Sequence, residues 1–281
     1  MRRQVIASQP GPQPPRALTV AGSDSGGGAG IQADLKTFHA LGVYGMSVVT
    51  ALTAQNTLGV HGIHAVPADF VRLQLDVVVE DLGVDVVKTG MLANAEIITS
   101  VAAGLRDHGL ERVVIDPVSA SKHGDPLLHP EAVDALREAL LPLALVVTPN
   151  VSEVGLLCGV KVNGVADLRP AAEAMLELGP RWVLVKGGHL PGNEDAIDLL
   201  TNGETWHEVR SRRLDTRDTH GTGCTLASAI GGRLALGDDV ITAVQEAKRF
   251  VTGAIANGIP VGAGIGPVNP AWDARRGIRL P

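Results

Sequence analysis

The sequence predicts an α/β domain built on a mostly parallel central sheet with helices on both faces. Short, nearly continuous apolar segments alternate with longer segments whose apolar residues recur at helical spacing. Strands that are apolar throughout belong to sheets buried on both sides, and strands that alternate with helices usually run parallel. Residues 195–217 differ, because their apolar and polar residues alternate, and they predict a hairpin-like excursion.

The order of the elements follows from the same patterns. Strands are predicted at residues 17–21, 46–52, 85–88, 112–116, 143–148 and 182–186. Helices are predicted at residues 30–41, 67–82, 94–108, 130–141, 166–178, 222–236 and 239–257. Pro67 suits a first helical position and Asn94 suits an N-cap. Ligands of such sheets bind beyond the carboxyl ends of the strands, where nearly every unusual motif of this sequence lies.

Composition narrows the class of protein. The 281 residues are 45% hydrophobic and 19% charged, as in globular proteins, and the net charge of −6 argues against a nucleic-acid surface. No apolar run is long enough to span a membrane. Cys158 and Cys224 lack the spacing of a metal or disulfide framework, so a reduced, cytoplasmic setting is expected. Residues 1–16 predict a disordered, proline-rich leader, followed by one domain over residues 17–281.

The first glycine-rich segment, AGSDSGGGAGIQAD at residues 21–34, joins a predicted strand to a predicted helix. Gly28-x-Gly30-x-x-Ala33 is similar to a dinucleotide fingerprint, but residues 35–68 contain no acidic residue to complete it, so a Rossmann site is excluded. The glycines indicate a backbone that approaches a ligand closely. Asp34 suits either a site carboxylate or a solvated carboxylate at the helix start, and the residues alone favour neither.

A second motif, TALTAQNT at residues 50–57, ends an apolar strand with the amides of Gln55 and Asn56. Such amides are often ordinary turn residues. At the carboxyl edge of a parallel sheet, an amide can instead recognise a planar heterocycle, because its carbonyl accepts from an amino group while its NH2 donates to a ring nitrogen.

Four further strand ends carry polar groups, in KTGML (88–92), IDPV (115–118), TPNVSEV (148–154) and VKGGH (185–189). Asp116, Asn150 and Glu153 suit a magnesium ion bound through water, and Glu153 equally suits a first-turn helix carboxylate. Lys186, followed by two glycines, suits a phosphate contact. Together the four segments predict a nucleotide site, and the absence of GxxxxGK[ST] excludes a P-loop.

The last motif, DTHGTGCTLASAI at residues 218–230, leads from a loop into a helix. Gly221, Thr222 and Gly223 stand at the helix start, where free N–H groups and the positive end of the dipole favour an anion. An ordinary glycine-rich helix start is the alternative, but it does not explain the small residues that follow. The first side chain beyond the loop is the thiol of Cys224.

These segments together resemble the ribokinase-like family and, within it, the hydroxymethylpyrimidine and phosphomethylpyrimidine kinases of thiamine biosynthesis. The resemblance covers residues 17–268 and includes GGAGIQADLKTF, TAQNT, KTGMLA, GDPLL, TPN, KGGH, HGTGCTLASAI and VQEAK. Gly-Thr-Gly-Cys at the phosphate loop is the vitamin-kinase form, where sugar kinases carry Gly-Ala-Gly-Asp. One departure is Ser25-Gly26, where the family commonly has Pro-Ser.

The resemblance implies ATP and Mg²⁺, and as acceptor 4-amino-5-hydroxymethyl-2-methylpyrimidine followed by its monophosphate. It implies that Gln55, Gly22 and Met91 bind the pyrimidine and that Asp34 faces the hydroxymethyl group. Lys186, Gly221, Gly223 and Cys224 would hold the transferring phosphoryl group. The nucleotide residues would be Asp116, Asn150, Lys186 and Thr222, and the magnesium residues Asn150 and Glu153.

Two other functions stay open at this point. A pyridoxal kinase of the same fold would share most of these motifs, and a non-catalytic pyrimidine-binding protein would share the pocket. A homodimer is expected from the family and from residues 43–66, which predict an edge flap over the pocket. For Cys224 we expect a largely neutral thiol that avoids repelling a phosphate acceptor and assists only the alcohol step, although the helix start could lower the pKa of the thiol.

Overall fold

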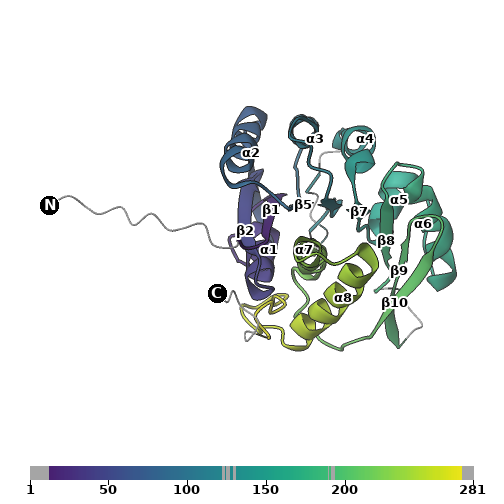
Figure 1. Ribbon diagram of the computed structural model, residues 1–281. Helices are drawn as coiled ribbons and strands as arrows, with labels where there is room; N and C mark the ends of the chain where they lie inside the picture. Colours follow the sequence, from purple (N-terminus) through teal and green to yellow (C-terminus); the bar gives the residue numbers. More distant parts are fainter. Residues whose placement is uncertain are drawn as a thin grey trace.

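The computed structural model describes residues 13–121, 124, 127–128, 131–188, 190 and 194–273. An eight-stranded sheet runs through its centre in the order β10-β9-β8-β7-β6-β5-β1-β2 (Figure 1). Its strands are β1 (Arg16–Ala21), β2 (Tyr44–Val49), β5 (Val86–Thr89), β6 (Val113–Ile115), β7 (Val146–Val147), β8 (Trp182–Lys186), β9 (Asp195–Thr201) and β10 (Trp206–Arg212). Neighbours from β2 to β8 are parallel, whereas β9 is antiparallel to β8 and β10. The mostly parallel sheet and the late hairpin are therefore confirmed.

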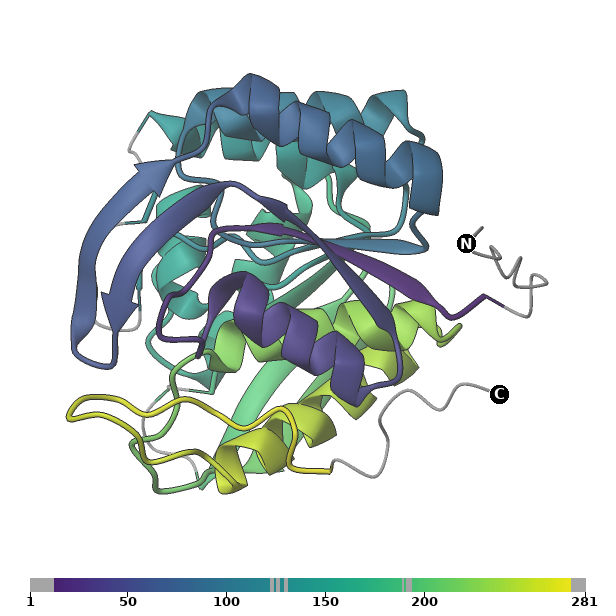
Figure 2. The same ribbon diagram turned by 90° about the vertical axis from the view of Figure 1, so that its left-hand side faces the viewer.

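Helices cover both faces of this sheet. They are α1 (Gly30–Ala40), α2 (Ala68–Leu82), α3 (Ala95–Asp107), α4 (Ala132–Ala135), η1 (Leu136–Leu140), η2 (Leu141–Leu143), α5 (Val151–Cys158), η3 (Val165–Asp167), α6 (Leu168–Leu176), α7 (Thr222–Ala235) and α8 (Val240–Ala256). Figure 2 shows α2 on one side of the sheet and α1, α7 and α8 on the other. No helix among the described residues has the length and apolar character needed to cross a bilayer.

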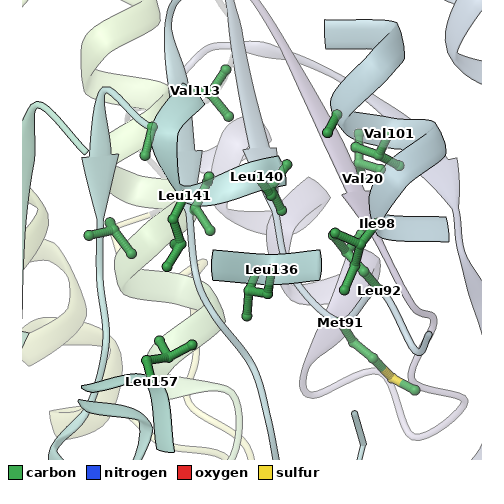
Figure 3. Packing of buried hydrophobic residues seen from close by; sticks show 14 of the residues in the cluster. Val20, Met91, Leu92, Ile98, Val101, Val113, Leu136, Leu140, Leu141 and Leu157 are labelled. Carbon is green, nitrogen blue, oxygen red and sulfur yellow. The ribbon is translucent and has the colours of Figure 1, made fainter. Parts of the chain in front are cut away.

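The sheet separates two apolar cores. The larger core packs the sheet against α2, α3 and α6, and the other packs it against α7 and α8. All residues of β5 are buried because helices cover both of its faces. Figure 3 shows the larger core, with the Met91 side chain extending away from Leu92 and Ile98 at its margin. The core therefore holds the segment after β5 in place, with Met91 at the margin of the core.

The predicted strand at residues 46–52 is in fact two strands. β2 ends at Val49, and after Thr50 the chain continues as β3 (Ala51–Asn56), which pairs with β4 (Gly59–Ala65) in a separate two-stranded sheet. The break occurs at Thr50, which is bonded to two other segments of the chain. Its N–H donates to the Ala21 carbonyl at the end of β1, and its hydroxyl donates to the Met91 carbonyl after β5. We call the β3–β4 sheet the flap, and Figure 2 shows it projecting from the edge of the fold.

The predicted helix starts and amino-terminal segment agree with the structure in part. Asn94 is the N-cap of α3, as predicted, since its side chain accepts from the Ile97 N–H at 2.9 Å. Helix α5 was not among the predicted helices, although a helix start at Glu153 was left open as an alternative. Residues 1–12 of the predicted leader lie outside the described residues, and Arg16 belongs to β1, so the strand begins within the leader.

Candidate functional site

One cavity of about 670 Å³ lies at the carboxyl ends of the parallel strands. Loops after β1, β5, β6, β7 and β8 contribute to its wall, together with the flap and the start of α7. Every predicted site residue except Asp34 lines it, namely Gly22, Gln55, Met91, Asp116, Asn150, Glu153, Lys186, Gly221, Thr222, Gly223 and Cys224. Residues spread over most of the chain therefore meet in one space, at the edge of the sheet where such ligands bind.

Two glycine loops are in direct contact beneath this cavity. Gly221 caps α7 with a φ of +80°, and a Cβ at this position would lie 1.8 Å from the Gly28 carbonyl oxygen. A Cβ on Gly30 would lie 2.3 Å from the Gly22 carbonyl oxygen. The sequence suggested that these glycines allow a ligand to approach the backbone closely. At Gly28 and Gly30, the group that comes close is instead another part of the protein's own chain. The contact holds the start of α7 against the β1–α1 loop.

The start of α7 has unoccupied N–H groups that face the cavity wall. Its cap, Gly221, has no side chain to occupy the first N–H groups of the helix. Thr222 directs its hydroxyl to the Thr219 carbonyl at 2.7 Å, which steadies the turn. A Cβ on Gly223 would lie 3.5 Å from the Lys186 Nζ and 3.6 Å from the Asp116 Oδ2. The helix N-terminus and a lysine therefore face the same part of the cavity.

Lys186 is shared by two carboxylates. Its Nζ lies 2.8 Å from Asp116 Oδ1 and 4.0 Å from Glu153 Oε2. Burial raises the pKa of Glu153 to about 7, since the opposing attraction of Lys186 is offset in part by the negative charge of Asp116. The cluster thus combines two carboxyl groups with one ammonium and has room for a further positive charge.

Asn150 and Glu153 form a capping box at the start of α5. The Asn150 side chain accepts from the Glu153 N–H at 2.9 Å, and Glu153 Oε2 accepts from the Asn150 N–H at 2.7 Å. The structure thus contains the helix-start role that the sequence left open for Glu153, while its role toward a metal stays a prediction. The described residues contain no group of three His, Cys, Asp or Glu placed to hold a metal directly.

Asp24 and His220 were quoted within motifs but not assigned a role, and they form a buried pair at the flap end of the cavity. Asp24 accepts from the N–H groups of Gly26, Gly28 and Ala29, and His220 Nε2 lies 2.9 Å from Asp24 Oδ2. Burial would raise the pKa of Asp24, but the hydrogen bond and charge of His220, together with the N–H groups of Ala29 and Gly26, outweigh burial and lower the pKa. The pair therefore stabilises the first glycine loop.

The same pair sets the orientation of the Gln55 amide. The Gln55 Nε2 lies 3.4 Å from the His220 Nε2, and that ring nitrogen already donates to Asp24. Thr53 donates its hydroxyl to the Ser23 carbonyl at 2.8 Å, so it has no second proton for the Gln55 Oε1 at 3.3 Å. Turning the amide lets its nitrogen donate to Thr53 and places its oxygen, rather than an N–H group, beside the His220 N–H that Asp24 already accepts.

Asp34 does not line the cavity and instead pairs with a residue that the sequence analysis missed. Its carboxylate is fully buried and lies 2.9 Å from the Nζ of Lys88, which is also fully buried. Thr19 and Ser228 donate to the same carboxylate. Lys88 stands in the quoted KTGML segment, and a lysine at the end of an otherwise apolar strand was the signal available for it.

Cys224 is partly buried in the cavity wall, and its desolvation raises the pKa of its thiol to about 11. The positive charge of Lys88 and a hydrogen bond from the Gly30 N–H act in the opposite direction but are outweighed. The idea that the helix start lowers the pKa of the thiol is therefore wrong, because desolvation dominates. At neutral pH the thiol is uncharged.

A second buried ion pair lies at the cavity wall, between Asp198 of β9 and Lys248 of α8. Lys248 Nζ lies 2.7 Å from Asp198 Oδ2, and Asp198 Oδ1 accepts from the Gly187 N–H next to Lys186. The aspartate in the apolar segment AIDLL was the sequence signal for this pair. It holds the loop after β8 against α8.

Comparison with known proteins places this arrangement among characterised enzymes. The profile of phosphomethylpyrimidine kinases matches residues 24–269. The chain is 57% identical to the hydroxymethylpyrimidine/phosphomethylpyrimidine kinase of Streptomyces coelicolor, over 95% of this chain and 98% of the relative.

Solved structures agree with this family. A Bacillus subtilis pyridoxal kinase in complex with ADP is similar with a TM-score of 0.87 and 40% identity, covering 93% of this chain and 99% of that chain. The phosphomethylpyrimidine kinase of Clostridium difficile is similar with a TM-score of 0.76 and 44% identity, covering 85% and 99%.

Proposed function

The chain belongs to the phosphomethylpyrimidine kinase family, and on that premise we propose that it uses ATP to phosphorylate 4-amino-5-hydroxymethyl-2-methylpyrimidine and then its monophosphate. The reaction would serve thiamine biosynthesis. The observation that carries the proposal is the single cavity, which joins an amide suited to a pyrimidine to an anion-binding helix start. A phosphoryl donor and a heterocyclic acceptor would therefore meet in one space.

The nucleotide would occupy the side of the cavity formed by the later strands. Lys186 and the N–H groups at the start of α7 offer positive charge to its phosphates, and Gly223 lies beside Lys186. Thr222, Asp116 and Asn150 line the same wall. The ADP complex of the B. subtilis pyridoxal kinase supports a nucleotide in this fold.

Mg²⁺ fits the oxygen donors of this wall. Asp116 and Glu153 bring two carboxyl groups beside a single Lys186, and the Asn150 side chain adds an amide oxygen nearby. A divalent cation bound there through water and nucleotide oxygens would relieve the repulsion between the two carboxylates. When bound, the ion would supply charge that stabilises the phosphates. Glu153 and Asn150 are its proposed protein partners.

The acceptor would bind beneath the flap. Gln55 would hold the pyrimidine edge, and Met91, whose Sδ would be 3.1 Å from a Cβ on Gly22, would pack on the ring. With its oxygen toward His220, the Gln55 amide keeps one N–H and one lone pair for a ligand. Asp34 takes a different part from the one that the family resemblance suggested: it lies outside the cavity and would act through Lys88.

Phosphoryl transfer needs positioning and charge more than it needs a base, because the transition state is loose in most analyses. The N–H groups of Gly221, Gly223 and Cys224 would stabilise the charge on the transferring group. The neutral thiol of Cys224 adds no negative charge next to it. A phosphate monoester, with a second pKa of about 6, is already mostly ionised at neutral pH and needs no base.

Phosphorylation of pyridoxal is the second candidate, favoured by the similarity to the B. subtilis pyridoxal kinase. The deciding experiment measures ADP formation with the free pyrimidine, its monophosphate and pyridoxal, separately and in competition. We expect turnover with both pyrimidines and a higher kcat/KM for them than for pyridoxal. No ADP formation with any acceptor, despite pyrimidine binding, would indicate a non-catalytic binding protein.

A cytoplasmic homodimer belongs to the same proposal. Leu52 and Ile63 of the flap and Leu58 at its tip are 52%, 43% and 60% exposed, so the flap presents apolar side chains to its surroundings. A second copy that covers the flap would bury them. Light scattering after size-exclusion chromatography would give twice the chain mass, and a Leu58→Lys variant should lower it.

A further inference from the structure

Lys88 is a further cation in the wall of the cavity, separate from Lys186. It stands on β5, its side chain is fully buried, and it lines the cavity. A Cβ on Gly90 would lie 3.1 Å from its Nζ, so the ammonium is close to the backbone that leads to Met91. A buried ammonium is costly unless it is paired, and Lys88 is paired with Asp34.

Hydrogen bonds fix the orientation of the Lys88–Asp34 pair. Asp34 Oδ1 accepts from Ser228 and Asp34 Oδ2 accepts from Thr19, each at 2.6 Å, and both oxygens accept from Lys88 at 2.9 Å. The carboxylate is thus held inside the protein, away from the cavity, whereas the lysine is at the cavity wall. An ammonium has three N–H groups, and among the described residues only the two Asp34 oxygens are its hydrogen-bond partners. One N–H of the ammonium is therefore left without a protein partner among the described residues, in a side chain that lines the cavity.

The two lysines have different nearest neighbours in the cavity wall. Lys186 adjoins Gly223 and is shared by Asp116 and Glu153 on the nucleotide side. Lys88 adjoins Gly90, one residue before Met91 on the acceptor side, and its charge acts on the thiol of Cys224. A phosphate group carried by the acceptor would therefore come closer to Lys88 than a nucleotide phosphate would.

We propose that Lys88, oriented by Asp34, is the specificity-determining residue for the phosphorylated acceptor: its ammonium binds the phosphate of the monoester during the second phosphorylation. The proposal rests on the proposed function. When a dianionic monoester attacks the nucleotide, two negatively charged groups approach each other, and a fixed cation between them offsets the repulsion. The free pyrimidine offers an uncharged hydroxyl, so it gains little from Lys88. The lysine stays protonated and takes no proton in either step.

The test compares the two acceptors in the same variants. Lys88→Met removes the cation, and the double variant Asp34→Asn with Lys88→Met removes both charges, so that no unpaired carboxylate is left buried. We expect kcat/KM for the monophosphate to fall about 10- to 100-fold more than kcat/KM for the free pyrimidine, as for the loss of a hydrogen bond to a charged group. Circular dichroism would report folding.

The matched control is Lys248→Met, which also removes a buried lysine of the cavity wall from an aspartate partner. It should affect both acceptors to the same extent. Ser228→Ala keeps both charges of the pair and removes one hydroxyl from Asp34, so it provides a milder variant if the others unfold. We expect it to lower the monophosphate reaction about threefold more than the alcohol reaction, in proportion to one weakened hydrogen bond.

Equal losses with both acceptors in the folded variants would overturn the proposal and make Lys88 a structural residue. The failure of the proposed function has a different signature, because the unchanged protein would then form no ADP with either pyrimidine. A wild-type protein active on both acceptors, with variants that lose only the monophosphate reaction, would support the assignment of Lys88.

Discussion

His220 Nε2 donates a hydrogen bond to Asp24 Oδ2 at 2.9 Å, across 196 residues of sequence. This bond connects the loop before α7 to the loop before α1, and the donor nitrogen also faces the Gln55 amide. The backbone of His220 is tied as well, since its N–H donates to the Gly266 carbonyl and its carbonyl accepts from Val268. One histidine therefore positions both the anion-binding loop and the amide proposed to hold the pyrimidine.

Loss of the imidazole should disturb acceptor binding. We expect His220→Ala to raise KM for the pyrimidine about 3- to 10-fold, because the Gln55 amide loses the polar contact with His220 that helps to orient it. Thr53→Val removes the other contact and should act in the same direction. Steady-state kinetics with each substrate varied in turn would measure both effects. An unchanged KM in both variants would mean that Gln55 does not need this network.

Gln55 itself should matter for the pyrimidine and hardly for ATP. Leucine fills a similar volume but leaves the amino group and ring nitrogen of the acceptor unpaired, which costs about 1–3 kcal/mol per buried group. Gln55→Leu should therefore lower kcat/KM for the pyrimidine at least tenfold. Asn56→Leu is the control, because Asn56 does not belong to the cavity wall. Equal effects of the two substitutions would remove Gln55 from the site.

Glu153→Gln should shift the magnesium dependence to higher concentrations without unfolding the chain. The substitution removes one of the two carboxyl groups beside Lys186 but keeps a side-chain oxygen for the Asn150 N–H. A titration of ADP formation against Mg²⁺ would measure the shift, with Glu173→Gln on the exposed face of α6 as control. A titration curve that stays in place would mean that Glu153 only caps α5.

Glu153→Gln should also change how the stability of the protein depends on pH. Burial raises the pKa of Glu153 from its ordinary 4.5 to about 7 in the folded protein. Between these values the folded state retains a proton that the unfolded state has released, so this group makes the protein less stable as pH rises from about 4.5 to 7. Glu153→Gln cannot titrate and should lose this part of the pH dependence. Urea denaturation at several pH values would detect the difference.

Gly221→Ala should inactivate the enzyme with both acceptors. The new Cβ would lie 1.8 Å from the Gly28 carbonyl oxygen, so the two glycine loops would have to separate. Gly237→Ala is the matched control, because Gly237 has a φ of +100° but nothing within 4 Å of its Cβ position. We expect at least a 100-fold loss of kcat/KM for Gly221→Ala alone. Equal losses in both variants would attribute the effect to backbone strain.

Cys224→Asp should damage the monophosphate step more than the alcohol step. The new carboxylate would repel a phosphate acceptor in a desolvated site and would also attract the ammonium of Lys88 away from it. We expect about a tenfold difference between the two acceptors. Cys224→Ser, which stays neutral, should treat both acceptors alike. Equal losses in Cys224→Asp would mean that the residue only fills space.

The sequence by itself determined the alternation of strands and helices, and with it the parallel sheet. It also determined the glycine loop at α1 and the glycine-rich start of α7, because periodicity, caps and glycines are local signals. Since parallel strands place their carboxyl ends on one edge, the motifs that follow them were expected to converge. The cavity that contains Gln55, Lys186 and Gly221 confirms this convergence.

Only the tertiary structure decided which charges pair. Lys88 meets Asp34 across 54 residues, and Lys248 meets Asp198 across 50, and no local pattern encodes such distances. The division of one apolar run into β2 and β3 likewise depends on the bonds of Thr50 to distant carbonyls. Desolvation is also a property of the packed molecule: at Cys224 it outweighs the positive charge of Lys88, raises the pKa of the thiol and keeps it neutral.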